Sequence, residues 1–186
     1  SSGEVYYKGS FVENKRSGEG SEFRKDGSIN YEGTWENDMR HGEGMIVSRQ
    51  GNPLYAGSFA SGKPEGTGKE FRKEGQVFYE GEWKAGKKEG FGKFFNTQGK
   101  VMYEGAFLSG KPHGYGKEFR GENILLFEGE WADGKKHGTG KHFFPDGKIA
   151  FEGNFVANNR EGYGKEFRKD STLYYDGTWK KGKRSG

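Results

Sequence analysis

The chain has 186 residues, with 31 Lys and Arg, 27 Asp and Glu and a net charge of +4, which is small for a nucleic-acid-binding protein. It contains no Cys, which excludes a disulfide framework and a thiolate metal site, and no apolar run is long enough to span a bilayer. Since no signal-peptide h-region is visible either, we expect a soluble, cytoplasmic protein. The 16 Phe, 10 Tyr and 4 Trp argue against disorder, because disordered chains are poor in aromatic residues.

A 24-residue repeat recurs along the whole chain. In each copy a Tyr or Phe precedes a Gly by two residues and another ring follows that Gly by two. The copies start near residues 7, 31, 55, 79, 103, 127, 151 and 175, which makes about seven and a half repeats. Because composition shifts nowhere along the chain, we expect residues 1–186 to form a single repeat array.

The first half of each repeat is predicted to be a strand with one buried face. In the second copy, every second residue is a ring or the glycine: Tyr31, Gly33 and Trp35. In a strand these positions point to the same face of the sheet. Since the central Gly lacks a side chain, we expect a large ring from a neighbouring strand to lie across its backbone. The core positions of this kind are Tyr31, Gly33, Trp35, Tyr79, Gly81, Trp83, Phe127, Gly129 and Trp131.

The second half of each repeat is predicted to be a turn followed by a second strand. Five residues after the central Gly stands Asn, Asp or Gly, the residue types that tolerate positive φ. A Gly-x-Gly pair follows, and three residues later comes an apolar residue; Phe71, Phe119 and Phe167 are expected core members of this type. A second turn signal such as Asp26-Gly27 closes the repeat. We therefore predict an all-β fold, an elongated, twisted antiparallel meander of tandem β-hairpin repeats forming an open, solenoid-like array.

Alternate repeats differ, which gives a longer period of 48 residues. Odd repeats end the first strand in Phe and carry Glu-Phe-Arg in the second, whereas even repeats end in Trp and are less charged, as at Phe94 and Phe144. Two interpretations stay open. The charged second strands of odd repeats and the less charged ones of even repeats either form alternating polar and apolar stripes on one face of the array, or they pack against each other.

Residues 79–92, Tyr-Glu-Gly-Glu-Trp-Lys-Ala-Gly-Lys-Lys-Glu-Gly-Phe-Gly, resemble a MORN (membrane occupation and recognition nexus) motif. The motif recurs at residues 103–116 and 127–140, and the resemblance covers nearly the whole chain. It implies an all-β array of hairpins that acts as a scaffold, as in cytoskeletal and ciliary proteins, junctional membrane proteins and some lipid kinases.

No catalytic constellation stands out in the sequence. The Gly-x-Gly pair recurs seven times, whereas a phosphate-binding loop occurs once, at a strand-to-helix turn, and ends in Gly-Lys-Ser/Thr. His41, His113 and His137 occupy one turn offset in different repeats, so they are spread along the array instead of converging. We expect a protein that is not an enzyme and has no cofactor and no metal.

A membrane surface is one candidate partner, because the turn after the first strand is basic in several repeats. The candidate lipid-binding residues are Lys87, Lys88, Lys135, Lys136, Lys183 and Arg184. Each basic residue near an anionic surface contributes about 1 kcal/mol, so the interior repeats add little each. The expected lipid affinity is modest.

Another protein is the favoured partner, since an extended β-surface with aromatic residues at tolerant positions provides a docking groove. Other repeats hold Glu or Thr between the paired glycines, but three hold an aromatic residue there. The candidate partner-binding residues are these three, Phe91, Tyr115 and Tyr163, together with Phe94 and Phe144. Simple packing is the alternative, and homodimerisation and end-to-end association through the unpaired end strands both stay open.

Overall fold

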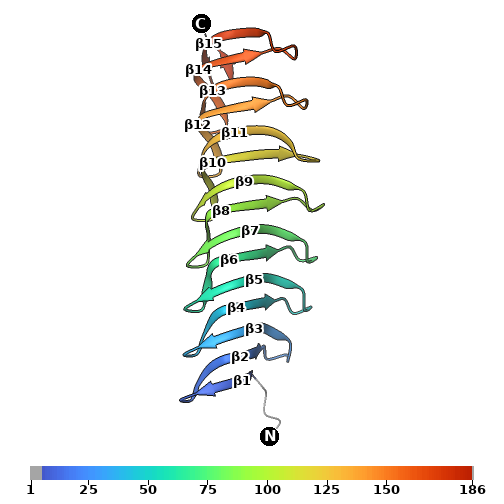
Figure 1. Ribbon diagram of the computed structural model, residues 1–186, viewed down its shortest axis with the longest axis vertical. Coiled ribbons are helices and arrows are strands. Elements are labelled where there is room, and N and C mark those ends of the chain that lie inside the picture. Colours follow the sequence, from blue (N-terminus) through green and yellow to red (C-terminus); the bar gives the residue numbers. More distant parts are fainter. Residues whose placement is uncertain (1–5, 186) are drawn as a thin grey trace. The chain divides into compact units, whose positions relative to one another are not determined.

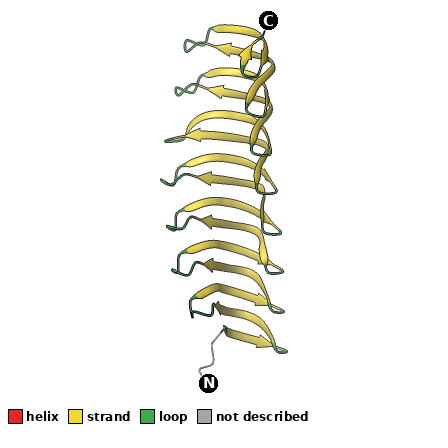
Figure 2. Cartoon of the chain, turned by 180° about the vertical axis from the view of Figure 1, so that it is seen from behind, coloured by secondary structure: helices red, strands yellow, loops and turns green. Residues whose placement is uncertain are grey.

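The structure is a computed structural model that describes residues 6–185, and in this range its regular elements are β-strands (Figures 1 and 2). The first eight are β1 (Tyr7–Val12), β2 (Lys15–Phe23), β3 (Ile29–Glu36), β4 (Met39–Val47), β5 (Pro53–Ala60), β6 (Lys63–Phe71), β7 (Val77–Lys84) and β8 (Lys87–Phe95). The others are β9 (Val101–Leu108), β10 (Lys111–Arg120), β11 (Ile124–Ala132), β12 (Lys135–Phe143), β13 (Ile149–Val156), β14 (Asn159–Phe167), β15 (Leu173–Lys180) and β16 (Lys183–Arg184).

The strands are antiparallel and follow one another in chain order from β1 to β16, which confirms the predicted all-β meander of hairpins (Figure 1). The chain divides into two compact units, residues 1–88 and 89–186, with the boundary inside β8. We call them the N-terminal and the C-terminal unit.

The predicted hairpin turns are confirmed. Val12 pairs with Lys15, so the loop between β1 and β2 consists of Glu13 and Asn14 alone, and both have positive φ (51° and 61°). Positive φ at both central positions is the geometry of a type I′ turn, whose twist matches that of the flanking strands. The predicted second position has positive φ in every repeat, at Asn14, Asp38, Gly62, Gly86, Gly110, Gly134, Asn158 and Gly182.

The central glycine meets a ring residue of its own strand and not, as predicted, one of a neighbouring strand: a Cβ atom built on Gly33 would lie 2.7 Å from the Tyr31 hydroxyl oxygen and 2.5 Å from the Glu43 carbonyl oxygen and the Gly44 Cα atom on β4. Tyr31 comes from the same strand as Gly33, and its ring crosses to Gly44 on β4, where a built Cβ atom would lie 2.5 Å from the Tyr31 Cζ atom. The Tyr31 hydroxyl then donates to the Thr34 carbonyl oxygen at 3.1 Å. Period-2 alternation identifies the buried face of a strand, but it does not show the bend that brings this ring back over its own backbone.

That bend comes from an irregular register between the two strands of each hairpin. Gly33 pairs with Gly44 and Trp35 with Arg40, so one residue of β3 faces three residues of β4. Gly42 lies within these three residues at a φ of 61°, a conformation that glycine adopts without a steric penalty.

The core of the N-terminal unit is a continuous series of edge-to-face ring pairs. Tyr7, Tyr31 and Tyr55 each contact the ring that ends their own strand and the equivalent ring of the next repeat, so Tyr31 touches both Trp35 and Phe59. Across the series the ring centroids lie 5.1–5.4 Å apart at interplanar angles of 82–88°. Tyr31, Trp35, Tyr55, Phe59 and Tyr79 are buried, and Trp83 is half-buried. Such pairs add about 0.5–1.5 kcal/mol each beyond the area they bury.

The C-terminal unit repeats this arrangement, with centroids 5.1–5.5 Å apart and angles of 83–88°. Here Phe127 and Phe151 replace two of the tyrosines, and both are fully buried. Phe71, Phe119 and Phe167, expected in the core, are half-buried near strand ends, where they pair with Val77, Leu125 and Leu173.

Candidate functional site

The sheet face opposite the rings carries two rows of side chains that flank the glycines. One row holds the residue before the central Gly of each first strand and the residue after the Gly-x-Gly pair of each second strand. In the C-terminal unit its charge alternates from strand to strand: Lys93, Glu104, Lys117, Glu128, Lys141, Glu152, Lys165 and Asp176. The second row holds the residues on the other side of the glycines, including Phe91, Tyr115, Thr139, Asn154 and Tyr163. Lys93 and Glu104, which are adjacent in the first row, form an ion pair at 3.5 Å.

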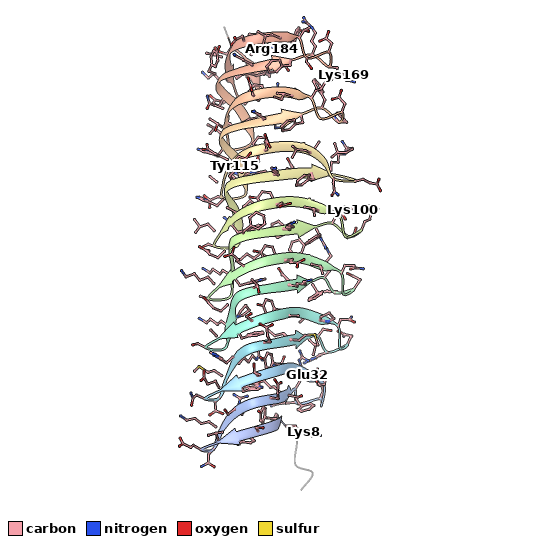
Figure 3. All side chains as sticks on the ribbon, in the orientation of Figure 1. Lys8, Glu32, Lys100, Tyr115, Lys169 and Arg184 are labelled. Atoms are coloured by element: carbon pink, nitrogen blue, oxygen red, sulfur yellow. The ribbon has the colours of Figure 1, made fainter. Side chains whose placement is uncertain are left out.

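A hollow of about 440 Å³ lies between these rows in the C-terminal unit. Its floor is the backbone of Gly129, Gly140 and Gly153, and Tyr115 and Tyr163 both line it. The remaining lining side chains are Glu128, Thr139, Lys141, Glu152, Asn154 and Lys165. We call this hollow the tyrosine trough; Figure 3 labels Tyr115.

The two tyrosines of the trough are exposed but fixed by carboxylates. Tyr115 is 57 % and Tyr163 53 % exposed. The Tyr163 hydroxyl donates to Asp176, which raises the pKa of Tyr163. Partial burial, the charge of Glu128 and a hydrogen bond to it raise the pKa of Tyr115. Since Glu128 and Asp176 belong to the first row, each tyrosine reaches across the glycine floor from one row to the other.

The N-terminal unit has a corresponding hollow of the same volume, about 440 Å³, but no aromatic side chain lines it. Glu43 stands where the trough has Tyr115, Thr67 corresponds to Thr139, and the charged lining residues are Glu43, Lys69 and Glu80. The glycine floor is therefore common to both units, whereas the tyrosines distinguish the C-terminal one.

The structure brings only two of the five candidate partner-binding residues together. Phe91 lies on the same row as Tyr115 and is 50 % exposed, but it does not line the trough. Phe94 lies on the ring face, half-buried, with its ring centroid 4.9 Å from that of Phe107. Phe144 is half-buried beside the turn after β12, where its amide donates to the Lys148 carbonyl oxygen at 2.8 Å.

The 48-residue alternation corresponds to packing between successive repeats. The indole of Trp35 donates to the Gly20 carbonyl oxygen of the preceding repeat at 3.1 Å, and the other three tryptophans do the same. Where the next repeat supplies the smaller Phe, the preceding strand provides a larger apolar or aromatic partner: Phe94 packs on Phe107, and His142 stacks on Phe155 at 5.3 Å. Burial lowers the pKa of His142 to about 4, with smaller contributions from Lys136 and Arg160.

The candidate lipid-binding residues separate into two groups. Three are exposed at the hairpin turns: Lys87, Lys135 and Lys183. The other three turn toward the rings and pair with a glutamate of the preceding repeat: Lys88 with Glu70 (2.5 Å), Lys136 with Glu118 (2.6 Å), and Arg184 with Glu166. The side chains of Lys88 and Lys136 are only 15 % exposed. Sequence reasoning counted both residues of each pair as surface charge, because the irregular register that turns the second one inward leaves no signal in the residue pattern.

Within residues 6–185, no group of three or more His, Asp and Glu side chains is arranged to hold a metal ion. No helix among these residues is long and apolar enough to cross a membrane.

Comparison with known families gives one match, to the MORN repeat. It covers residues 7–29, 31–52, 55–77, 79–100, 103–120, 127–149, 151–172 and 175–186. Comparison with curated proteins found no match.

Proposed function

Because the chain belongs to the MORN repeat family, whose repeats are generally non-catalytic interaction modules, we propose that it is a scaffold that binds another protein through the tyrosine trough. The observation that carries this proposal is the exposure of Tyr115 and Tyr163 over a floor without side chains. Neither ring belongs to the edge-to-face core, and Thr67 and Thr139 occupy the same offset in other repeats. Tyrosine is enriched at protein interfaces, because it offers a large contact area and loses little conformational entropy.

The family's known settings suggest where such a scaffold acts. We infer a cytoplasmic role at a cytoskeletal, ciliary or membrane-associated assembly. Long arrays in which each repeat contacts only its neighbours suit such roles, because they present extended surfaces.

Affinity capture with matched variants tests the binding role. The wild-type protein and the double variant Tyr115→Ser/Tyr163→Ser are immobilised and exposed to an extract of the native cell. We expect a specific partner on the wild type and its loss from the double variant. Leu108→Ser, at a residue that is 46 % exposed and does not line the trough, is the control and should keep the partner. A partner captured equally by all three proteins would contradict the assignment to the trough.

Peripheral binding to anionic phospholipid is the second candidate function, and the exposed Lys87, Lys135 and Lys183 favour it. At about 1 kcal/mol per exposed basic residue near the surface, the affinity should be weak and salt-sensitive. Flotation with vesicles that contain or lack phosphatidylserine tests it. Lys135→Ala should reduce flotation more than Lys136→Ala, because Lys136 is already paired with Glu118. Flotation independent of salt and of anionic lipid would exclude this function.

A further inference from the structure

The floor of the tyrosine trough cannot extend the sheet to a bound peptide. Gly140 is in register with Gly129 on one side and Gly153 on the other, and Gly129 and Gly153 are likewise flanked by Gly116 and Gly164. Their strands lie inside the sheet with partners on both sides, so the floor does not present the free ladder edge that a peptide added as a strand requires. A ligand must therefore be recognised by the tyrosines and the wall side chains.

The charges of the lining favour an uncharged occupant. Two lysines, Lys141 and Lys165, and two glutamates, Glu128 and Glu152, line the trough, so their charges sum to zero. The corresponding hollow of the N-terminal unit has one lysine and two glutamates, which sum to −1. A charged segment in the trough would meet a like charge on an adjacent strand wherever it found an opposite one, whereas an uncharged segment would meet no such repulsion.

The spacing of the tyrosines favours an extended left-handed helix. Tyr115 lies on β10 and Tyr163 on β14, four strands apart, which is about 19 Å at about 4.8 Å per strand. A polyproline II helix rises about 3.1 Å per residue, so a residue and the sixth residue after it, two full turns apart, are also about 19 Å apart. One hairpin repeat of two strands spans about 9.6 Å and one polyproline II turn about 9.3 Å, so every third residue of such a segment meets the same position in successive repeats.

The chemistry of the walls fits the same ligand. A polyproline II segment has no internal hydrogen bonds, and its carbonyl oxygens need donors. The Thr139 hydroxyl and the Lys141 ammonium group stand between the two tyrosines and can donate to them. Proline rings dock on aromatic side chains in the grooves that recognise proline-rich peptides.

We propose that the tyrosine trough binds an uncharged, proline-rich segment of about seven residues in the polyproline II conformation, with its first proline on Tyr115 and its last on Tyr163. This inference rests on the proposed function, since it names the chemistry of the partner segment that the trough accepts.

Titration of the intact chain with capped decaproline tests the proposal, and a capped Gly-Ser peptide of the same length serves as the ligand control. Binding is measured by isothermal titration calorimetry and by ¹H–¹⁵N NMR shifts. We expect saturable binding of decaproline, with shifts centred on Gly129, Gly140 and Gly153, and none of the Gly-Ser peptide. Tyr115→Ser/Tyr163→Ser should weaken binding at least about ten-fold, the effect of losing about 1.4 kcal/mol.

Thr139→Tyr is a second variant that keeps both tyrosines but fills the space between them, and it should also abolish binding. Each variant must keep the wild-type melting temperature, so that loss of binding is not loss of fold. Absence of saturable binding by the wild type, or equal binding by Thr139→Tyr, would overturn the proposal. If decaproline fails to bind while capture of a native partner still depends on Tyr115 and Tyr163, the trough is a protein-binding site for another kind of segment and the proposed function stands.

Discussion

Replacing Gly140 by Ala tests the contact between ring and glycine on which every repeat depends. A Cβ atom built on Gly140 would lie 2.5 Å from the Phe127 Cε2 atom, far inside van der Waals contact. The φ of Gly140 is not positive, so Ala introduces a steric conflict without backbone strain. Either the methyl group or the Phe127 ring must move.

The Phe127 ring has no free space to move into. It is fully buried, and its centroid lies 5.5 Å from that of Trp131 and 5.1 Å from that of Phe155. Overpacking of a core costs about 1–3 kcal/mol and complete loss of a Phe ring about 3–5 kcal/mol. The reduced entropy of the unfolded chain returns about 0.4–1 kcal/mol for Gly→Ala. We therefore expect Gly140→Ala to lower the free energy of unfolding by about 2–4 kcal/mol.

Denaturant unfolding followed by fluorescence measures this change, and a double-mutant cycle with Phe127→Ala identifies its cause. Once the ring is gone, the closest remaining neighbour of the methyl group is the Glu128 carbonyl oxygen at 3.1 Å, so the double variant should be destabilised by much less than the sum of the single variants. Gly147→Ala is the matched control, because a Cβ atom there meets nothing within 4 Å and only its φ of 84° opposes the change. A cost for Gly140→Ala below that of the control, or additive effects in the cycle, would refute the reasoning.

Three other predictions concern stability. Trp83→Ala should cost about 3–5 kcal/mol in the same unfolding assay, as do other truncations of large aromatic side chains; a loss below about 1 kcal/mol would show that the half-buried indole adds little. Lys136→Ala should cost about 1–3 kcal/mol, because it leaves the Glu118 carboxylate without its ion-pair partner, whereas Lys135→Ala should change stability by less than about 0.5 kcal/mol. Burial lowers the pKa of His142 to about 4, so the folded protein binds fewer protons than the unfolded chain between about pH 6.5 and pH 4. The stability gained from a neutral His142 is complete above pH 6.5 and is lost as the pH falls through this window, by up to about 3 kcal/mol. His142→Phe should remove this part of the pH dependence of the free energy of unfolding, and an unchanged pH dependence would contradict the prediction.

The sequence was sufficient to predict the repeat, the two strands of each hairpin and both turns. These features depend on local chemistry, since positive φ selects Asn, Asp and Gly, and period-2 alternation selects one buried face. The bend that returns the Tyr31 ring over its own strand was not predictable, because it arises from the irregular pairing between Gly33 and Trp35.

The candidate site was predicted only in part. Tyr115 and Tyr163 were identified because they replace Glu or Thr at one offset, but the offset alone does not show that both line one hollow. Phe94 was selected by the same kind of reasoning and instead packs on Phe107. A repeat pattern shows which positions vary, whereas packing between repeats decides whether a variable position faces solvent.

Site-specific photo-cross-linking tests most directly whether the C-terminal unit's tyrosine trough is the docking surface. A benzophenone amino acid is placed at Thr139, inside the trough, or at Thr67, which lines the corresponding hollow of the N-terminal unit. We predict an adduct with the native partner from position 139 and none from position 67. Adducts from position 67 alone, or equal yields from both positions, would contradict the account.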